Sequence, residues 1–282
     1  MNLKRKIVFL DVDGTLMQEN GQVPASAITA VREARKNGHL LFLCTGRSKA
    51  AIFKNITEIG FDGVIGGAGV YAEINGDILY KKSLTLEEVT FLVDYFQERD
   101  IHFMMESDDI NYGSPGLKDF YIKAIESDSN VSDEFLTKDD HPLQQLMNIT
   151  KFDETLYQAN INKICFIGSE NTSYQEIEKD IKERLNIVPS SFVKFGKASG
   201  EVSSLGVHKA VGIKFILEHL DLSQEDTIGI GDSINDLEMI EYCAVGIAMG
   251  NARTELKAIA DEVTAPIDED GIYKSFKKHH LI

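Results

Sequence analysis

The sequence predicts an α/β protein, in which a doubly wound parallel sheet forms the core and a second α/β domain is inserted into it. Three observations favour this fold. Short, nearly continuous apolar runs end in Asp, Thr-Gly or Gly-Asn, and segments with helical periodicity lie between them. The stretch from Leu84 to Gly200 does not follow this pattern. The length of 282 residues also exceeds the ~150 residues typical of one domain.

The apolar runs are brief and bear few polar residues, which is typical of parallel strands that are buried on both faces. The expected strands are Ile7–Leu10, Leu40–Cys44, Gly63–Ile65, Thr227–Ile230 and Val245–Met249.

The segments between these strands have the spacing of amphipathic helices. Ala27–Lys36 ends at Asn37-Gly38, a sequence typical of a helix C-terminus, and Ala210–His219 and Leu256–Ala260 are further helices. Alternating strands and helices indicate a doubly wound sheet. In such sheets ligands bind beyond the carboxyl ends of the strands, so the polar residues that end each run are expected to converge there.

The middle of the chain predicts a separate unit. Asn75-Gly76 indicates a hairpin turn just before it. We expect a core domain of residues 1–83 and 201–282 and an inserted domain of residues 84–200. Within the insertion we expect helices at Leu86–Glu98 and Tyr174–Leu185, strands at Ile101–Met105, Lys163–Ile167 and Phe192–Phe195, and an aperiodic polar stretch at Glu126–Asp140.

Charge limits the classes of partner. The chain has 29 Lys plus Arg against 45 Asp plus Glu, a net charge of -16, which would repel the backbone of a nucleic acid. No nucleic-acid partner is therefore expected. A site for a small phosphate ester would need local positive charge from a metal ion, a lysine or backbone N–H groups.

The cysteines and the apolar runs indicate the compartment. Cys44, Cys165 and Cys243 lie in or beside apolar runs without C-x-x-C spacing, which argues against a disulfide framework or a zinc site. No run reaches the ~18 apolar residues of a membrane span. We therefore expect a cytoplasmic protein that does not bind a membrane.

The first candidate motif, Asp11-Val12-Asp13-Gly14-Thr15, begins where the first strand ends. Two carboxylates two residues apart on an extended chain face the same way, which suits a pair in which one attacks and the other carries a proton. An ordinary Asp-Gly turn after a strand is the structural alternative.

The second motif, Gly231-Asp232-Ser233-Ile234-Asn235-Asp236, follows a later strand. Asp232 could be a second carboxylate ligand for a hard cation such as Mg²⁺. Ser233-x-x-Asp236 also has the pattern of a capping box, and the two roles can coexist.

Thr45-Gly46-Arg47 ends the second strand, and its hydroxyl and backbone N–H groups suit a phosphate, although Thr-Gly is also common in turns. Lys209 lies in the first turn of a predicted helix, where a cation opposes the helix dipole. That placement favours a functional role, while an ordinary surface lysine is the alternative.

Two competing patterns are rejected. Gly67-Ala68-Gly69-Val70-Tyr71-Ala72 matches the dinucleotide pattern G-x-G-x-x-A, but the residues after it predict a hairpin instead of the required helix. Cys44 and Arg47 are separated by only two residues, too few for the loop of a cysteine phosphatase. Cys44 is expected to be a buried strand residue.

Taken together, Asp11–Leu16 (D-V-D-G-T-L), Thr45–Arg47, Lys209 and Gly231–Asp236 resemble the haloacid dehalogenase superfamily, and most closely its Cof-like phosphatases. The order and spacing of the motifs agree along the whole chain, and the gap between Arg47 and Lys209 matches the place of that subfamily's α/β cap. The segment Ala248–Ala252 is also similar. The resemblance implies a Rossmann-like core and a cap domain.

The resemblance also implies roles for individual residues. Asp11 would be the nucleophile and Asp13 the general acid and base. The carboxylates of Asp11 and Asp232, with the Asp13 carbonyl, would hold Mg²⁺, and Asp236 would support the metal through its water shell. The residues that would bind the phosphoryl group are Val12, Thr45, Gly46, Lys209 and Asn235. Lys209-Ala210 stands where many relatives have Lys-Gly, a small departure because Ala favours a helix.

The expected function is therefore a Mg²⁺-dependent phosphatase of small phosphorylated metabolites, with sugar phosphates favoured, acting as a monomer or homodimer. A phosphomutase or phosphotransferase, a dehalogenase and a non-catalytic regulatory binding protein are the alternatives. Five cap residues either face the substrate or form a surface loop, and the loop is the favoured interpretation: Met104, Met105, Glu106, Asp108 and Tyr112.

Overall fold

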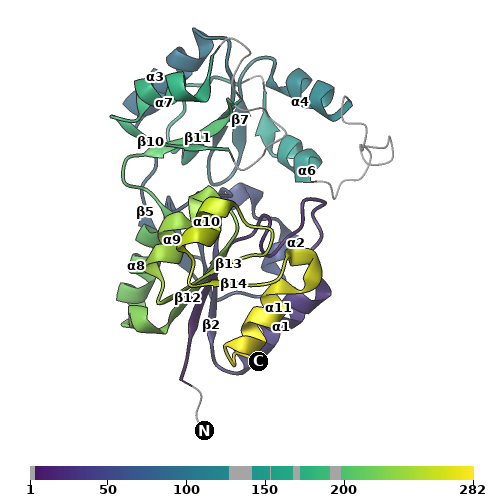
Figure 1. Ribbon diagram of the computed structural model, residues 1–282. Coiled ribbons are helices and arrows are strands. Elements are labelled where there is room, and N and C mark those ends of the chain that lie inside the picture. The colour runs from purple at the N-terminus through teal and green to yellow at the C-terminus, as the bar shows by residue number, and fades with distance from the viewer. Residues whose placement is uncertain (1–3, 127–141, 153, 168–171, 191–197) are drawn as a thin grey trace. The chain divides into compact units, whose positions relative to one another are not determined.

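The computed structural model describes residues 4–126, 142–152, 154–167, 172–190 and 198–282. These residues group into two compact units (Figure 1). Residues 4–47, 52–81 and 208–282 form the core unit, and the described residues of 48–51 and 82–207 form the cap unit. The main segment of the cap unit therefore interrupts the chain of the core unit.

The core unit is built on an eight-stranded sheet, which confirms the predicted fold class. Its strand order is β14-β13-β12-β1-β2-β3-β4-β5. The pairs from β14 to β3 are parallel, and β3-β4 and β4-β5 are antiparallel. The strands are β1 (Ile7–Leu10), β2 (Leu40–Cys44), β3 (Gly63–Gly66), β4 (Tyr71–Ile74), β5 (Asp77–Lys81), β12 (Thr227–Gly231), β13 (Val245–Ala248) and β14 (Glu262–Val263).

Helices cover both faces of this sheet. In Figure 1, α1 and α11 lie together on one face, and α8, α9 and α10 lie on the other. Every residue of β1 is buried because both faces are covered, which explains its continuous apolar sequence. The helices of the core unit are α1 (Ala25–Lys36), α2 (Lys54–Thr57), α8 (Lys209–Leu220), α9 (Leu237–Tyr242), α10 (Thr254–Ile259) and α11 (Gly271–Lys278).

The hairpin predicted at Asn75-Gly76 joins β4 to β5. Both turn residues have left-handed backbone angles, with φ 52° at Asn75 and 88° at Gly76, which suits the Asn-Gly sequence. No helix follows Gly67-Ala68-Gly69, so the rejection of the dinucleotide pattern is confirmed.

The cap unit has a six-stranded sheet of order β10-β11-β9-β6-β7-β8. Apolar side chains on one face pack against α3 and α7, and those on the other face pack against α4. The strands are β6 (His102–Glu106), β7 (Asn111–Gly113), β8 (Thr150–Lys151), β9 (Lys163–Ile167), β10 (Leu185–Pro189) and β11 (Gly200–Ser204), and the helices are α3 (Leu86–Gln97), α4 (Leu117–Glu126), α6 (Pro142–Asn148) and α7 (Tyr174–Ile181).

Two expectations for the cap need correction. The helix predicted at Tyr174–Leu185 ends at Ile181, and Leu185 begins β10 instead. The predicted domain limit at residue 200 falls inside β11, which pairs with β9 and β10 of the cap sheet. The predicted strand Phe192–Phe195 and residues 127–140 of the predicted polar stretch lie outside the described residues.

Candidate active site

The candidate active site lies at the carboxyl ends of β1, β2 and β12. β1 runs parallel to both neighbours, with Leu10 opposite Leu43 and Ile230. Asp11 follows directly, and its N–H donates to the Ile230 carbonyl at 3.0 Å. This hydrogen bond continues the ladder by one residue, so Asp11 is held at the end of the strand and is buried, at 4% exposure.

Lys209 connects two of the predicted carboxylates. Its Nζ lies 2.6 Å from Asp11 Oδ1 and 2.5 Å from Asp236 Oδ1, and its side chain has 0% exposure. Burial disfavours the charged amine, but the carboxylates of Asp11 and Asp236 outweigh this and raise the pKa of Lys209. A cation at the start of α8 is therefore explained by these two partners, and the surface-lysine alternative is wrong.

Both carboxylate oxygens of Asp236 accept hydrogen bonds. Its Oδ2 accepts the backbone N–H groups of Asp232 and Ser233, each at 3.0 Å, while its Oδ1 faces Lys209. Gly231 is required beside it, because a Cβ on that residue would overlap the Asp236 carboxyl carbon. Asp236 thus organises the turn after β12 and also fixes Lys209.

Asp232 is held by the loop after β1. Its Oδ1 accepts the Thr15 hydroxyl at 3.0 Å. Gly14 packs directly on this carboxylate with φ +83°, and a Cβ there would overlap Asp232 Oδ2. Asn251 adds a further support, because its Nδ2 donates to the Gly14 carbonyl at 2.8 Å. Sequence reasoning assigned no role to Thr15, although the residue stands in the D-V-D-G-T-L motif.

Asp13 forms a two-pronged ion pair with Arg47. Arg47 Nε lies 2.8 Å from Asp13 Oδ2, and its Nη2 lies 2.7 Å from Oδ1. Two parallel bonds of this kind fix the orientation of a carboxylate. Arg47 was noted within Thr45-Gly46-Arg47, but it was not among the predicted site residues, and only the structure reveals this pairing.

The groups predicted to bind phosphate include unpaired donors. Among the described residues, neither the Val12 N–H nor the Gly46 N–H has a hydrogen-bond partner. The Thr45 hydroxyl oxygen accepts the Arg47 N–H at 3.1 Å. The Asn235 side-chain oxygen is buried, and no described residue hydrogen-bonds to it. Their role in phosphate binding stays a prediction.

Negative charge dominates the site. Four carboxyl groups, those of Asp11, Asp13, Asp232 and Asp236, accompany two cations, Lys209 and Arg47, which gives a formal net charge of −2 when all six groups are ionised. Burial raises the pKa of Asp11 well above its ordinary value. Burial, and then the charge of Asp236, raise the pKa of Asp232 to about 7.

A hard divalent cation fits this arrangement. Carboxylate oxygens of Asp11, Asp232 and Asp236 all lie within 4.8 Å of one another. Oxygen donors of this kind suit Mg²⁺, and its charge would balance the excess. Asp236 already has a partner on each oxygen, so Asp11 and Asp232 are the carboxylates available as ligands.

The raised pKa of Asp232 makes the stability of the metal-free protein depend on pH. Between about pH 4 and 7 the folded chain keeps a proton that the unfolded chain has lost, so stability should fall as pH rises through this window. We expect the thermal midpoint measured with chelator to fall over this range and to recover when Mg²⁺ is added. Asp232→Asn should flatten the profile, and an unchanged slope in that variant would contradict the assignment.

The cap unit has its own polar groups. Met104, Met105 and Glu106 are buried residues of β6, so the surface-loop interpretation is wrong for them. Glu106 Oε1 accepts the Cys165 thiol at 3.1 Å and lies 3.6 Å from Lys163 Nζ. Asp108 precedes β7 and accepts a hydrogen bond from Asn162, and Tyr112 belongs to β7.

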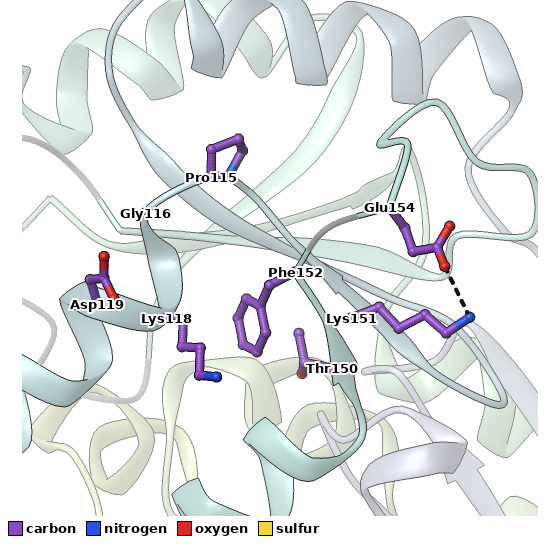
Figure 2. A pocket seen from close by; sticks show the side chains of 8 residues that line it. All are labelled: Pro115, Gly116, Lys118, Asp119, Thr150, Lys151, Phe152 and Glu154. Carbon is purple, nitrogen blue, oxygen red and sulfur yellow. Dashed lines mark hydrogen bonds and ion pairs between the residues drawn. The ribbon is translucent and has the colours of Figure 1, made fainter.

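A pocket of about 860 Å³ also lies in the cap unit. Figure 2 shows the side chains of Lys118, Thr150 and Phe152 pointing to the same side, and Lys151 paired with Glu154. Lys151 Nζ lies 3.4 Å from Glu154 Oε1. The pocket is lined by Pro115, Gly116, Lys118, Asp119, Thr150, Lys151, Phe152 and Glu154. None of them is a predicted catalytic residue.

Comparison with known proteins places this chain in one family. Residues 8–276 match the haloacid dehalogenase-like hydrolase family, so the chain belongs to it. YkrA of Bacillus subtilis is 29% identical over 98% of both chains. The phosphatase YwpJ of the same organism is 25% identical over 98% of this chain and 100% of its own.

A solved structure extends the likeness to three dimensions. The sugar phosphatase BT4131, of subclass IIB of the same superfamily, aligns with a TM-score of 0.78 and 28% identity over 98% of this chain and 100% of its own. The chain is therefore an enzyme of the phosphatase type within this family, as the four motifs predicted. No helix among the described residues is long and apolar enough to cross a membrane.

Proposed function

We propose that this protein is a Mg²⁺-dependent phosphatase that acts through an aspartyl phosphate formed on Asp11. One observation carries the proposal: a buried carboxylate contacts a buried lysine, beside a second carboxylate, in a site with a formal net charge of −2. Asp11 Oδ1 faces Lys209, while Oδ2 has no hydrogen bond to any described residue. Oδ2 is therefore the oxygen available for attack.

The reaction has two steps. Asp11 Oδ2 attacks phosphorus, the bond from phosphorus to the ester oxygen breaks, and Asp13, which enters this step in its protonated form, gives its proton to the departing alkoxide. Asp13 then takes a proton from water, the water oxygen attacks phosphorus, and the bond from phosphorus to Asp11 breaks. Inorganic phosphate leaves and Asp11 is restored.

The other residues stabilise charge and hold the phosphoryl group. Lys209 and the N–H groups of Val12 and Gly46 offset the negative charge of the phosphoryl oxygens, with Thr45 and Asn235 as further contacts. When bound by the carboxylates of Asp11 and Asp232 and the carbonyl of Asp13, Mg²⁺ supplies further positive charge beside the phosphoryl group. Arg47 keeps the Asp13 carboxylate in one orientation.

Small phosphorylated metabolites are the proposed substrates, and sugar phosphates are favoured. The likeness to the sugar phosphatase BT4131, with 28% identity over nearly the whole chain, supports this preference. The relative YitU of Bacillus subtilis, 25% identical, is named for a phosphorylated ribitylaminouracil, so the screen should include such compounds. The cytoplasm remains the expected compartment.

Metal removal tests the proposal. In a screen of phosphorylated metabolites, we expect phosphate release to fall more than about 100-fold with chelator and to return with Mg²⁺. Activity on halogenated acids that survives the chelator would identify a dehalogenase instead. Transfer to a sugar acceptor that exceeds phosphate release would identify a phosphotransferase.

A further inference from the structure

The loop between β3 and β4 has a backbone that sequence reasoning left without a role. Gly67, Ala68 and Gly69 have φ angles of 59°, 57° and 104°, so three successive residues lie in the left-handed region. Ala68 is the informative one, because an L-residue with a Cβ is disfavoured there. Strained backbone of this kind persists where the surroundings fix it, and it is frequent beside functional sites.

One side of this loop holds the Thr45-Gly46-Arg47 turn. The Ala68 N–H donates to the Thr45 carbonyl at 2.9 Å, and the Gly67 N–H donates to the Arg47 carbonyl at 2.7 Å. In a trans peptide the C=O and the following N–H point in opposite directions. Because the Thr45 carbonyl faces the loop, the Gly46 N–H points away from it and stays unpaired among the described residues.

The other side of the loop lies against the start of α8. The Gly69 Cα is so close to His208 that an added Cβ would overlap the His208 carbonyl and lie 3.0 Å from the Lys209 backbone nitrogen. Lys209 is the first residue of that helix, and its amine contacts Asp11. A small shift of the helix start would therefore move the amine relative to the nucleophile.

We infer that the loop from Gly66 to Val70 is a positioning element that sets the Thr45–Arg47 turn and the start of α8 in register with each other. Gly69 acts through Lys209, and Gly67 acts through the turn that orients the Gly46 N–H. The inference deepens the proposed function and rests on it for its kinetic consequences, while the placement of Lys209 can be measured without any turnover.

The test compares Gly69→Ala with Gly76→Ala. Both glycines have left-handed φ angles, of 104° and 88°, but no atom lies within 4 Å of a Cβ on Gly76. The control variant therefore carries the backbone strain without the contact. Two readouts are needed: kcat and KM on a phosphorylated substrate, and the rate at which an amine-reactive acetylating reagent modifies Lys209, followed by mass spectrometry.

We expect Gly69→Ala to lower kcat about 100-fold in protein that remains folded, because misplacing a catalytic group by about 1 Å has an effect of that size. Lys209, with 0% exposure in the native protein, should be acetylated at least about tenfold faster than in Gly76→Ala, as expected for a locally opened site. The exposed Lys214 on the same helix serves as the internal standard.

Equal kcat values and equal protection of Lys209 in the two variants would overturn the inference. If Gly69→Ala does not fold, Gly67→Ala tests the inference instead. An added Cβ on Gly67 would contact only the side chain of Val70. That variant should raise KM with little change at Lys209, and a wild-type KM would overturn the inference. If the wild-type protein has no phosphatase activity, the proposed function is wrong. The acetylation rates of Lys209 would still test whether the loop positions the start of α8.

Discussion

Asp11→Asn should reduce kcat/KM for phosphate release by at least about 10³-fold, since the amide cannot form the acyl phosphate. The metal-free variant should be no less stable than the wild type. Burial raises the pKa of Asp11 more than the charge of Lys209 lowers it, and the nearby carboxylates of Asp236 and Asp232 raise it further, so the ionised form is disfavoured in the folded protein. Steady-state kinetics and thermal unfolding with chelator measure the two effects.

Asp221→Asn is the matched control, because it makes the same chemical change far from the site. Asp221 is exposed at the end of α8 with φ 52°, a conformation that Asn also adopts readily. The control should keep full activity. Hydrolysis that persists in Asp11→Asn would show that another residue is the nucleophile.

Lys209→Met should destabilise the core unit by about 3–5 kcal/mol, because it leaves two buried carboxylates without their cation. Asp11 and Asp236 would then face each other with no compensating charge. Activity should fall about 100-fold or more, since the phosphoryl oxygens lose a positively charged partner. Thermal midpoints and kcat at a temperature where the variant is folded measure both effects.

Lys214→Met is the control on the same helix. The Lys214 side chain is 63% exposed and lies 3.9 Å from its ion-pair partner Glu218, so its removal should change stability by less than about 1 kcal/mol. The destabilisation by Lys209→Met should also be smaller at about pH 5 than at pH 8, because burial raises the pKa of Asp11 and its protonation at the lower pH relieves the repulsion. Equal effects at both positions would contradict the buried network.

Much of the core could be predicted because its signals are local. The runs at Ile7–Leu10 and Leu40–Cys44 match β1 and β2 at both ends, since strands buried on both faces need continuous apolar sequence. The rule that parallel strands present their carboxyl ends at one edge was enough to bring Asp11 and Asp232 together, whereas Lys209, at the start of a helix, was assigned from its place against the helix dipole and from the family resemblance.

The contacts within the site needed the structure. The pairing of Arg47 with Asp13, and the three bonds accepted by Asp236, depend on side-chain directions that tertiary packing sets. Their sequence signals are also ambiguous: Ser233-x-x-Asp236 satisfies a capping box whether or not it serves a lysine.

The cap was harder to predict because its strands pair over long distances. Leu185 continues the apolar spacing of α7, so the sequence pattern predicted a helix that extended to Leu185. Leu185 instead begins β10, which is a strand because it pairs with β11. The polar sequence around Glu106 indicated a loop, yet Glu106 is the last residue of β6. On the neighbouring strand, Lys163 forms an ion pair with its carboxylate and the Cys165 thiol donates a hydrogen bond to it.

The central claim is that phosphorus becomes bonded to Asp11, and chemical trapping tests it most directly. Acid quenching during turnover with Mg²⁺, followed by borohydride reduction, converts an aspartyl phosphate to homoserine, which peptide mass spectrometry locates. We expect homoserine at position 11, and none in the absence of substrate. Homoserine at another position, or none during rapid turnover, would contradict the claim.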